Sequence, residues 1–323
     1  MESFAGKRAV VTGGGSGMGR ELVIQLAAEG CSVATCDVSE AGLAETLARA
    51  EAGAAPGTKV TTHRCDVSDE SQVLRFRDEV LAAHGEPLHL LFNNAGIGGG
   101  GSFVNASREE WERTFGVDWW GVYYCSRAFM PLLVAADSAY LVNTSSVNGF
   151  WASLGPGVPH TAYSTAKFAV KGFSEALIED LRVNAPHVKV AVVMPGHIGT
   201  DIVANSRRYL GQPEPDAMTE ADLEETRANL ARRGLPVADL GADQLRGMAK
   251  MAEEMFRNNA PLSAAGAATV ILDGVRAGKW RILVGDDAHR LDEQVRANPE
   301  AAYDHAGTGL GTLSRTVGSD RPS

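Results

Sequence analysis

The sequence contains few cysteines and no clustered histidines. Its four cysteines are Cys31, Cys36, Cys65 and Cys125; none forms a CxxC pair, and all sit in or beside apolar segments. This usage indicates buried thiols in a reducing cytoplasm and argues against a disulfide framework. The eight histidines form no HExxH motif and no His/Cys cluster, so we expect no metal site.

Two further absences restrict the class of protein. No apolar run approaches the ~20 residues that a membrane-spanning helix needs, and the first residues, MESFAGKRAVVTGG, lack the apolar core of a signal peptide. There is also no excess of basic residues, because the formal net charge is -10. An acidic chain lacks the electrostatic attraction that dominates binding to polyanions, so we expect no nucleic-acid partner. From the lack of a long apolar run we expect no membrane span.

The 323 residues suffice for one large α/β domain or two small ones, and 44% of them are hydrophobic. Short, almost continuously apolar runs alternate with segments of helical spacing such as 20–30 and 40–52. The apolar runs are 8–13, 31–37, 60–66, 88–96, 139–146, 188–196 and 280–285. This alternation predicts a doubly wound parallel sheet of about seven strands with helices on both faces. We expect one domain over residues 1–298 and a loosely ordered tail over 299–323, which is rich in Gly, Ser and Thr.

Residues 200–262 depart from the alternation of strands and helices, because they contain helical stretches without a convincing strand. Within them, the segment 245–256 (LRGMAKMAEEMF) places Leu245 and three methionines at helical spacing. Two interpretations stay open: a flexible apolar lid over a bulky substrate, or a helix packed onto the core. The segment 220–233 is acidic at its start and basic at its end, which favours an exposed helix without a chemical role.

A glycine-rich segment, TGGGSGMGR, follows the first predicted strand and opens the first predicted helix. Gly13, Gly17 and Gly19 allow a tight turn and a close approach to a pyrophosphate, which the helix N-terminus attracts. Asp37 ends the second predicted strand, where its carboxylate can accept hydrogen bonds from an adenosine ribose. That carboxylate would repel a 2′-phosphate, which favours NAD over NADP. Arg20, or a cation from elsewhere in the chain, could reverse this preference.

Two further segments lie where the carboxyl ends of parallel strands meet. Asp66 and Val67 follow the third predicted strand; they can either close an adenine pocket or begin a helix with Asp66 as its N-cap. The segment 93–96 (NNAG) follows the fourth predicted strand, where Gly96 permits close approach to a ligand.

Tyr163 and Lys167 lie four positions apart in a segment with a helical stripe of apolar residues, so one turn separates them on one face. A free phenol has a pKa of about 10, and a nearby ammonium lowers that pKa by stabilising the phenolate. Tyr163 is therefore suited to proton transfer near neutral pH. Ser146, at the end of the fifth predicted strand, can donate a hydrogen bond to a substrate oxygen, and Ser145 is the alternative.

In this combination and order, the motifs resemble the short-chain dehydrogenase/reductase family. The motifs that carry the resemblance, over about residues 5–200, are Thr12–Gly19, Asp66, Asn93–Gly96, Ser146, Tyr163, Lys167 and Pro195–Thr200. The resemblance implies a Rossmann-type fold in which Tyr163 is the general acid/base, Ser146 orients the carbonyl and Lys167 lowers the tyrosine pKa and binds the nicotinamide ribose. The Ile198 backbone and the Thr200 hydroxyl would hold the carboxamide. The cofactor-binding residues that we expect, from these patterns and from the resemblance, are Gly13, Ser16, Gly17, Met18, Gly19, Asp37, Asp66, Val67, Asn93, Ala95, Gly96, Tyr163, Lys167, Pro195, Gly196, Ile198 and Thr200.

The sequence also departs from the family pattern. Asp118 stands where the family usually has an asparagine that helps to hold a water near the lysine, and an ionised carboxylate there would raise the pKa of Lys167. The loop before Tyr163 is longer than usual. The residues of this loop that we expect to line a substrate pocket are Trp151, Leu154 and His160. The last strand segment, WRILVGDDAH, lacks the glycine-rich ending of many tetrameric members.

These patterns predict an NAD(H)-dependent oxidoreductase that interconverts a hydrophobic secondary alcohol and its ketone. The expected catalytic residues are Ser146, Tyr163, Lys167 and Asp118. Two alternatives stay open: a carbonyl reductase that uses NADPH, and a dinucleotide-sensing binding protein without turnover, which only the aspartate at position 118 supports. Trp111, Trp119 and Trp120 are expected to serve packing or the interface of a homodimer or homotetramer.

Overall fold

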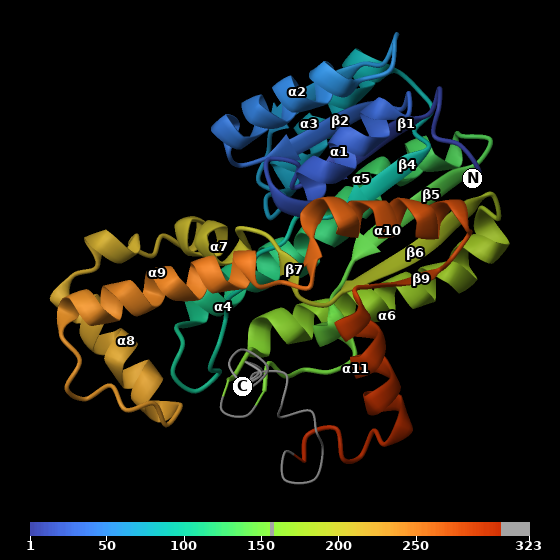
Figure 1. Ribbon diagram of the computed structural model, residues 1–323. Coiled ribbons are helices and arrows are strands. Elements are labelled where there is room, and N and C mark those ends of the chain that lie inside the picture. Colours follow the sequence, from blue (N-terminus) through green and yellow to red (C-terminus); the bar gives the residue numbers. More distant parts are fainter. Residues whose placement is uncertain (156–157, 305–323) are drawn as a thin grey trace, which may run out of the picture.

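The computed structural model describes residues 1–155 and 158–304. Its centre is a parallel sheet of seven strands in the order β3-β2-β1-β4-β5-β6-β9 (Figure 1). The strands are β1 (Arg8–Thr12), β2 (Ser32–Asp37), β3 (Val60–Arg64), β4 (Leu90–Asn93), β5 (Ala139–Thr144), β6 (Val188–Pro195) and β9 (Arg281–Val284). Each of the seven predicted apolar runs contains one strand, which confirms the doubly wound, Rossmann-type sheet.

Helices cover both faces of this sheet. The α-helices are α1 (Gly17–Ala28), α2 (Glu40–Gly53), α3 (Glu70–His84), α4 (Arg108–Phe115), α5 (Gly121–Val134), α6 (Thr161–Asn184), α7 (Ile202–Leu210), α8 (Glu220–Arg232), α9 (Ala242–Asn258), α10 (Ala264–Arg276) and α11 (Asp286–Ala297). On one face, Val11 of β1 belongs to the same core as Leu22 of α1 and Ile271 of α10. On the other face, Val10 belongs to the same core as Phe76 of α3. Because both sides of a strand are buried, its sequence is apolar throughout.

Residues 200–262 form an arm of helices that projects from the sheet, with α8 at its far end and α9 running back toward the domain (Figure 1). Where the arm leaves and rejoins the domain, β7 (Ile198–Gly199) pairs with β8 (Leu262–Ser263). The prediction that this region is helical is confirmed, and the segment 220–233 corresponds to α8. A capping box between Thr219 and Asp222 fixes the start of that helix.

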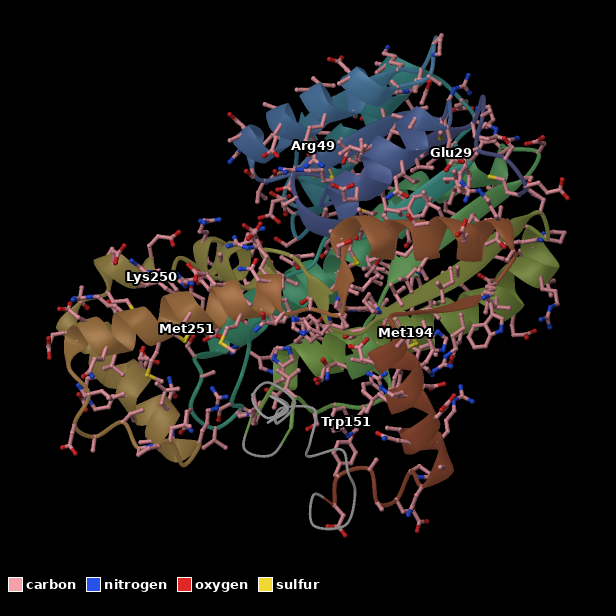
Figure 2. The ribbon with its side chains drawn as sticks, in the orientation of Figure 1. Glu29, Arg49, Trp151, Met194, Lys250 and Met251 are labelled. Carbon is pink, nitrogen blue, oxygen red and sulfur yellow. The ribbon has the colours of Figure 1, made fainter. Side chains whose placement is uncertain are left out.

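The three methionines of α9 face solvent, which contradicts the interpretation that they pack onto the core, whereas the interpretation of a flexible lid stays a prediction. Leu245 of the same helix is fully buried, whereas Met248, Met251 and Met255 are 37%, 59% and 38% exposed. Figure 2 shows Met251 on the projecting arm. The helix contacts the domain near its C-terminal end instead, where the rings of Phe256 and His197 lie 4.4 Å apart.

The chain after β9 packs against the loop that follows β5. Leu291 of α11 forms a small apolar cluster with Trp151 and Ala302, and Figure 2 shows Trp151 near α11. The indole Nε1 of Trp151 donates a hydrogen bond of 2.8 Å to the carbonyl oxygen of Ala302. Residues 299–304, expected to begin a loosely ordered tail, are therefore held against the domain, and 305–323 lie outside the described residues.

All four cysteines are buried and unpaired, as expected of structural thiols. Within residues 1–155 and 158–304, no helix combines the length and hydropathy required to cross a bilayer. The same residues contain no group of three or more His, Cys, Asp or Glu side chains that could hold a metal ion.

Candidate active site

The glycine-rich loop joins β1 to α1 in a conformation that only glycine permits at several positions. Gly13 has a φ of 71°, and a Cβ there would lie 2.7 Å from the Cα of Ala95. A Cβ on Gly19 would clash with the carbonyl oxygen of Gly13. The loop therefore lies close to the segment after β4, with the free N–H groups of the first turn of α1 beside it.

Asp37 is held at the end of β2 by two backbone groups. Its Oδ2 accepts a hydrogen bond of 2.9 Å from Gly15 N, and its Oδ1 accepts one of 2.9 Å from Ser39 N. Arg20, the cation that could favour NADP, is already engaged: its guanidinium donates to Gly15 O at 2.5 Å and pairs with Glu45. The Asp37 carboxylate therefore lines the cleft, and Arg20 of the glycine-rich loop is not free to pair with a ligand phosphate there.

A cavity of ≈ 360 Å³ runs along these loops. The predicted cofactor residues that line it are Gly13, Ser16, Gly17, Met18, Asp37, Asp66, Val67, Ala95, Gly96 and Thr200. The predicted cofactor residues outside this lining are Gly19, Asn93, Tyr163, Lys167, Pro195, Gly196 and Ile198. A glycine cradle, a helix N-terminus and a fixed carboxylate in one cleft suit the pyrophosphate and ribose of a dinucleotide.

Two predictions about the cleft need correction. Asn93 is buried away from the cavity, and its amide nitrogen donates to Ser126 Oγ and Asn143 Oδ1 at 2.9 and 2.8 Å. It ties β4 to β5 and α5, and Asn94 lines the cavity instead. Asp66 is not an N-cap, because Asp69 accepts the hydrogen bonds from the first turn of α3.

Ser146, Tyr163 and Lys167 come together as predicted. Ser146 follows β5, whereas Tyr163 and Lys167 lie on α6, with Lys167 Nζ 5.3 Å from the centre of the tyrosine ring. Lys167 Nζ also donates a hydrogen bond of 3.2 Å to the carbonyl oxygen of Thr144. The ammonium is thereby fixed between the end of β5 and the phenol.

Ser145, the alternative to Ser146, has a different role. Its hydroxyl is buried and donates a hydrogen bond of 2.7 Å to the carbonyl oxygen of Lys167. It does not line the substrate cavity described below, whereas Ser146 does. Ser145 therefore anchors α6 to β5, and Ser146 is the serine available to a substrate.

The pKa of Tyr163 is shifted upward, whereas the sequence led us to expect a downward shift. Burial raises the pKa of Tyr163 above its ordinary value, and Asp118 raises it further; Lys167 and a hydrogen bond with Ser146 lower the pKa but do not offset burial. Lys167 therefore acts in the predicted direction on a phenol whose net pKa is raised.

Asp118 lies on a π-helical turn, η1 (Gly116–Trp120), between α4 and α5. It is completely buried; its Oδ1 lies 3.1 Å from Lys167 Nζ and accepts a hydrogen bond of 3.2 Å from Ile97 N. Burial raises the pKa of Asp118 to about 6, against the influence of Lys167. Burial is the largest influence on Lys167 and lowers its pKa, but Asp118 and Tyr163 together outweigh burial and hold that pKa above its ordinary value. The raising effect of Asp118 has the predicted direction.

A second cavity, of ≈ 800 Å³, lies beside these groups and contains both Ser146 and Tyr163 in its wall. The three predicted substrate residues, Trp151, Leu154 and His160, all line it. The His160 ring lies 4.5 Å from the Tyr163 ring, and burial lowers the pKa of His160 to about 4, so the imidazole is neutral at physiological pH. We call this space the substrate cavity.

Several lining residues were not identified from the sequence. In the cofactor cavity they are Asn205, Arg208 and Tyr209 of α7; in the substrate cavity they include Arg207, Phe256, Arg290 and Leu291. These residues come from the arm and from α11, where no local motif marks a ligand. Only the length of the region after Thr200 indicated that it could reach the site.

The C-terminal helix also supports the segment after β6. Asp287 of α11 accepts a hydrogen bond of 2.7 Å from His197 N. A Cβ on Gly196 would clash with the Asp287 carboxylate, so glycine is required there. His197 Nε2 in turn lies 2.7 Å from the carbonyl oxygen of Phe256 in α9. The segment between β6 and the arm is thus fixed from both sides.

Comparison with known proteins gives a consistent result. Residues 7–210 match the family described as short chain dehydrogenase. SadH of Mycobacterium tuberculosis (strain ATCC 25618 / H37Rv) is 36% identical over 296 residues, which is 92% of either chain. Epidermal retinol dehydrogenase 2 of Homo sapiens is 35% identical over 202 residues, 62% of either chain. The crystal structure of a short chain dehydrogenase/reductase from Burkholderia phymatum in complex with NAD has a TM-score of 0.72 and 29% identity, over 100% of this chain and 99% of that one.

Proposed function

The chain belongs to the short-chain dehydrogenase family of oxidoreductases, and from that premise we propose that it interconverts a hydrophobic secondary alcohol and its ketone with NAD(H). The observation that carries the proposal is the position of the Ser146, Tyr163 and Lys167 set between two cavities. Ser146 and Tyr163 line the substrate cavity, while Lys167 Nζ lies beside Gly96, which lines the cofactor cavity. Ile202 lines both cavities, so the two spaces adjoin at this residue.

In this proposal, the bound nicotinamide supplies or accepts the hydride, and the protein handles the proton. In ketone reduction, Tyr163 donates its phenolic proton to the carbonyl oxygen, and in alcohol oxidation it accepts the hydroxyl proton. Ser146 donates a hydrogen bond that holds the same oxygen. The Lys167 ammonium stabilises the phenolate that forms, which opposes the effect of burial on the phenol.

The choice of NAD over NADP rests on Asp37 and Arg20. The fixed carboxylate of Asp37 lines the cofactor cavity and would repel a 2′-phosphate. Arg20 is engaged with Gly15 O and Glu45, so it offers no compensating charge. The structure from Burkholderia phymatum, which contains NAD, is consistent with this choice.

The substrate class rests on the wall of the substrate cavity. The apolar side chains that line it include Trp151, Leu154, Val203, Leu210, Phe256 and Leu291. A cavity of ≈ 800 Å³ with such a wall accommodates a bulky apolar molecule that presents one oxygen to Ser146 and Tyr163.

The proposal is tested by following the absorbance of the reduced nicotinamide with NADH and NADPH in parallel, against bulky and small ketones. Turnover with NADH and bulky ketones supports the proposal. Turnover only with NADPH contradicts the cofactor assignment but leaves the role of Tyr163 intact. Measurable dinucleotide binding without turnover of any ketone or alcohol tested would favour the alternative of a sensing protein, which the buried Asp118–Lys167 pair supports.

We also propose that the protein is a homodimer or homotetramer with an interface over α5 and α6. Trp120, directly before α5, and Phe168 of α6 are 43% and 42% exposed. Trp120 stacks on Tyr124 with ring centroids 5.7 Å apart, and Trp119 contacts Phe173 of α6 edge-on at 5.5 Å. A rigid, partly exposed aromatic cluster of this kind is typical of protein interfaces.

A further inference from the structure

Tyr209 of α7 contacts Asp66, a residue that follows β3 at the outer end of the cofactor cavity. The phenolic oxygen lies 3.0 Å from Oδ2 of Asp66 and 3.2 Å from its Oδ1. Both residues line the cofactor cavity, although 143 positions separate them in the sequence. The first helix of the arm therefore contacts the part of the cleft that follows β3.

The remaining partners of Asp66 all bind one of its two oxygens. Ser68 donates to Oδ1 from its backbone N at 2.9 Å and from its hydroxyl at 2.7 Å. Among the described residues, Oδ2 accepts a hydrogen bond only from Tyr209. A carboxylate oxygen accepts two hydrogen bonds, so Oδ2 has acceptor capacity left in the cavity wall.

The strand order indicates which part of a dinucleotide lies next to Asp66. β1 carries the glycine-rich loop for the pyrophosphate, β2 carries Asp37 for the ribose, and β3 is the next strand outward. Val38, Val67 and Val117 add apolar side chains to the cavity wall beside these residues. This end of the cleft suits a flat, largely apolar group such as the adenine ring.

Adenine that is bonded to ribose has a single hydrogen-bond donor, its 6-amino group, and a carboxylate can only accept. We propose that Tyr209 is a positioning residue that orients the Asp66 carboxylate so that Oδ2 accepts a hydrogen bond from this amino group. The inference rests on the proposed dinucleotide binding, with Asp66 at the adenine, and adds that Tyr209 sets how strongly the site prefers adenine over 6-oxo bases.

The protonation state of Tyr209 suits this role. Burial is the main cause that raises the pKa of Tyr209, to about 12, so the phenol stays protonated and donates its hydrogen to the carboxylate throughout the physiological range. Without that donor, Ser68 alone would hold the carboxylate, through Oδ1 only.

The seating of α7 does not depend on Tyr209 alone. Ser206 Oγ accepts a hydrogen bond of 2.7 Å from Gly98 N, and Asn205 Nδ2 donates one of 3.0 Å to Ser16 Oγ. Removing the Tyr209 hydroxyl therefore leaves two hydrogen bonds that hold the helix on the cleft. Ser206→Ala is the matched control, because it loosens α7 without touching Asp66.

The test compares dissociation constants of NADH and of the reduced nicotinamide hypoxanthine dinucleotide, in which a 6-oxo group replaces the 6-amino group. The proteins are the wild type, Tyr209→Phe, Ser206→Ala and Asp66→Ala, each verified by circular dichroism and measured by fluorescence titration. We expect the wild type to prefer NADH by about tenfold or more, the effect of one hydrogen bond to a charged acceptor. The preference should fall to within about threefold in Tyr209→Phe and Asp66→Ala and persist in Ser206→Ala.

Three results would overturn the inference. A wild type that binds both dinucleotides equally would mean that Asp66 does not read the 6-amino group. An undiminished preference in Tyr209→Phe would mean that Asp66 needs no positioning. Equal weakening of both dinucleotides in Tyr209→Phe, with the preference kept, would mean that Tyr209 only seats α7. A wild type that binds neither dinucleotide would instead refute the proposed function, and the inference with it.

Discussion

Lys167 Nζ lies 3.1 Å from Oδ1 of Asp118, in a pair whose side chains are 3% and 0% exposed. The second carboxylate oxygen, Oδ2, is buried and has no hydrogen-bond partner among the described residues. The pair joins α6 to the π-helical turn η1 and lies next to Tyr163. The phenol that we propose as the proton-transferring group therefore has a carboxyl group nearby as well as an ammonium.

Replacing Asp118 with asparagine should shift the pH dependence of alcohol oxidation toward lower pH. Asp118 is one of the groups that raise the pKa of Tyr163, so its neutralisation stabilises the phenolate that accepts the substrate proton. We expect the alkaline rise of kcat to move down by about one pH unit, which is typical of removing one nearby charge. The measurement is kcat against pH for both proteins. Asp180→Asn, at an exposed position of α6, is the control, and an unchanged Asp118→Asn profile would contradict the prediction.

The same aspartate predicts a pH dependence of stability. Its folded pKa of about 6 exceeds the ordinary 3.8, chiefly because burial disfavours the charged form. The folded state thus keeps this proton to higher pH than the unfolded state. The contribution stabilises the fold fully below pH 3.8 and is lost as the pH rises through 6.

We therefore compare the free energies of unfolding of the wild type and Asp118→Asn in urea. Relative to the variant, the wild type should lose roughly 3 kcal/mol between about pH 4 and pH 7, at 1.36 kcal/mol per pKa unit. A difference between the two proteins that does not change with pH would contradict the buried, proton-binding state of Asp118.

The features that the sequence predicts correctly depend on short stretches of chain. Strands buried on both faces need apolar residues throughout, so each apolar run marks a strand. A turn of helix places Tyr163 and Lys167 on one face, whatever surrounds them. The glycines at positions 13 and 19 are required by backbone contacts within the loop and with Ala95.

The features that the sequence does not reveal depend on tertiary packing. Tyr209 reaches Asp66, and Trp151 reaches Ala302, only because the arm and α11 fold back onto the cleft. The net pKa direction of Tyr163 depends on its burial, which no local pattern encodes. The sequence could not show that the methionines of α9 are exposed. An apolar stripe indicates that one side of a helix is apolar, but not whether that side is covered.

Tyr163→Phe should reduce kcat by about 100-fold or more, the usual contribution of a positioned acid–base group. The phenylalanine keeps the ring beside Lys167 and His160 but cannot exchange a proton. Dinucleotide affinity, measured by fluorescence titration, should stay within about twofold of the wild type, because Tyr163 does not line the cofactor cavity. Full activity of this variant would exclude Tyr163 as the general acid/base.

Asp37→Ser should weaken the preference for NADH over NADPH. The substitution removes the carboxylate that accepts ribose hydrogen bonds, so kcat/KM with NADH should fall about tenfold. The rise in kcat/KM with NADPH should be smaller than the fall in kcat/KM with NADH. The reason is that Arg20 stays engaged with Gly15 and Glu45 and supplies no charge for the 2′-phosphate. Parallel kcat/KM measurements with both cofactors decide the point. An unchanged preference for NADH over NADPH in Asp37→Ser would mean that residues other than Asp37 determine the cofactor preference.

Trp120→Glu should convert the proposed oligomer to a monomer. The indole is 43% exposed and stacks on Tyr124, so a partner subunit that covers this face would bury the introduced carboxylate. Burying an unpaired charge costs several kcal/mol, which exceeds what a protein interface usually tolerates. Light scattering coupled to size-exclusion chromatography measures the mass directly. Leu74→Glu, which places the same charge on an exposed position of α3, should leave the mass unchanged. A Trp120→Glu protein of unchanged mass would place the interface elsewhere.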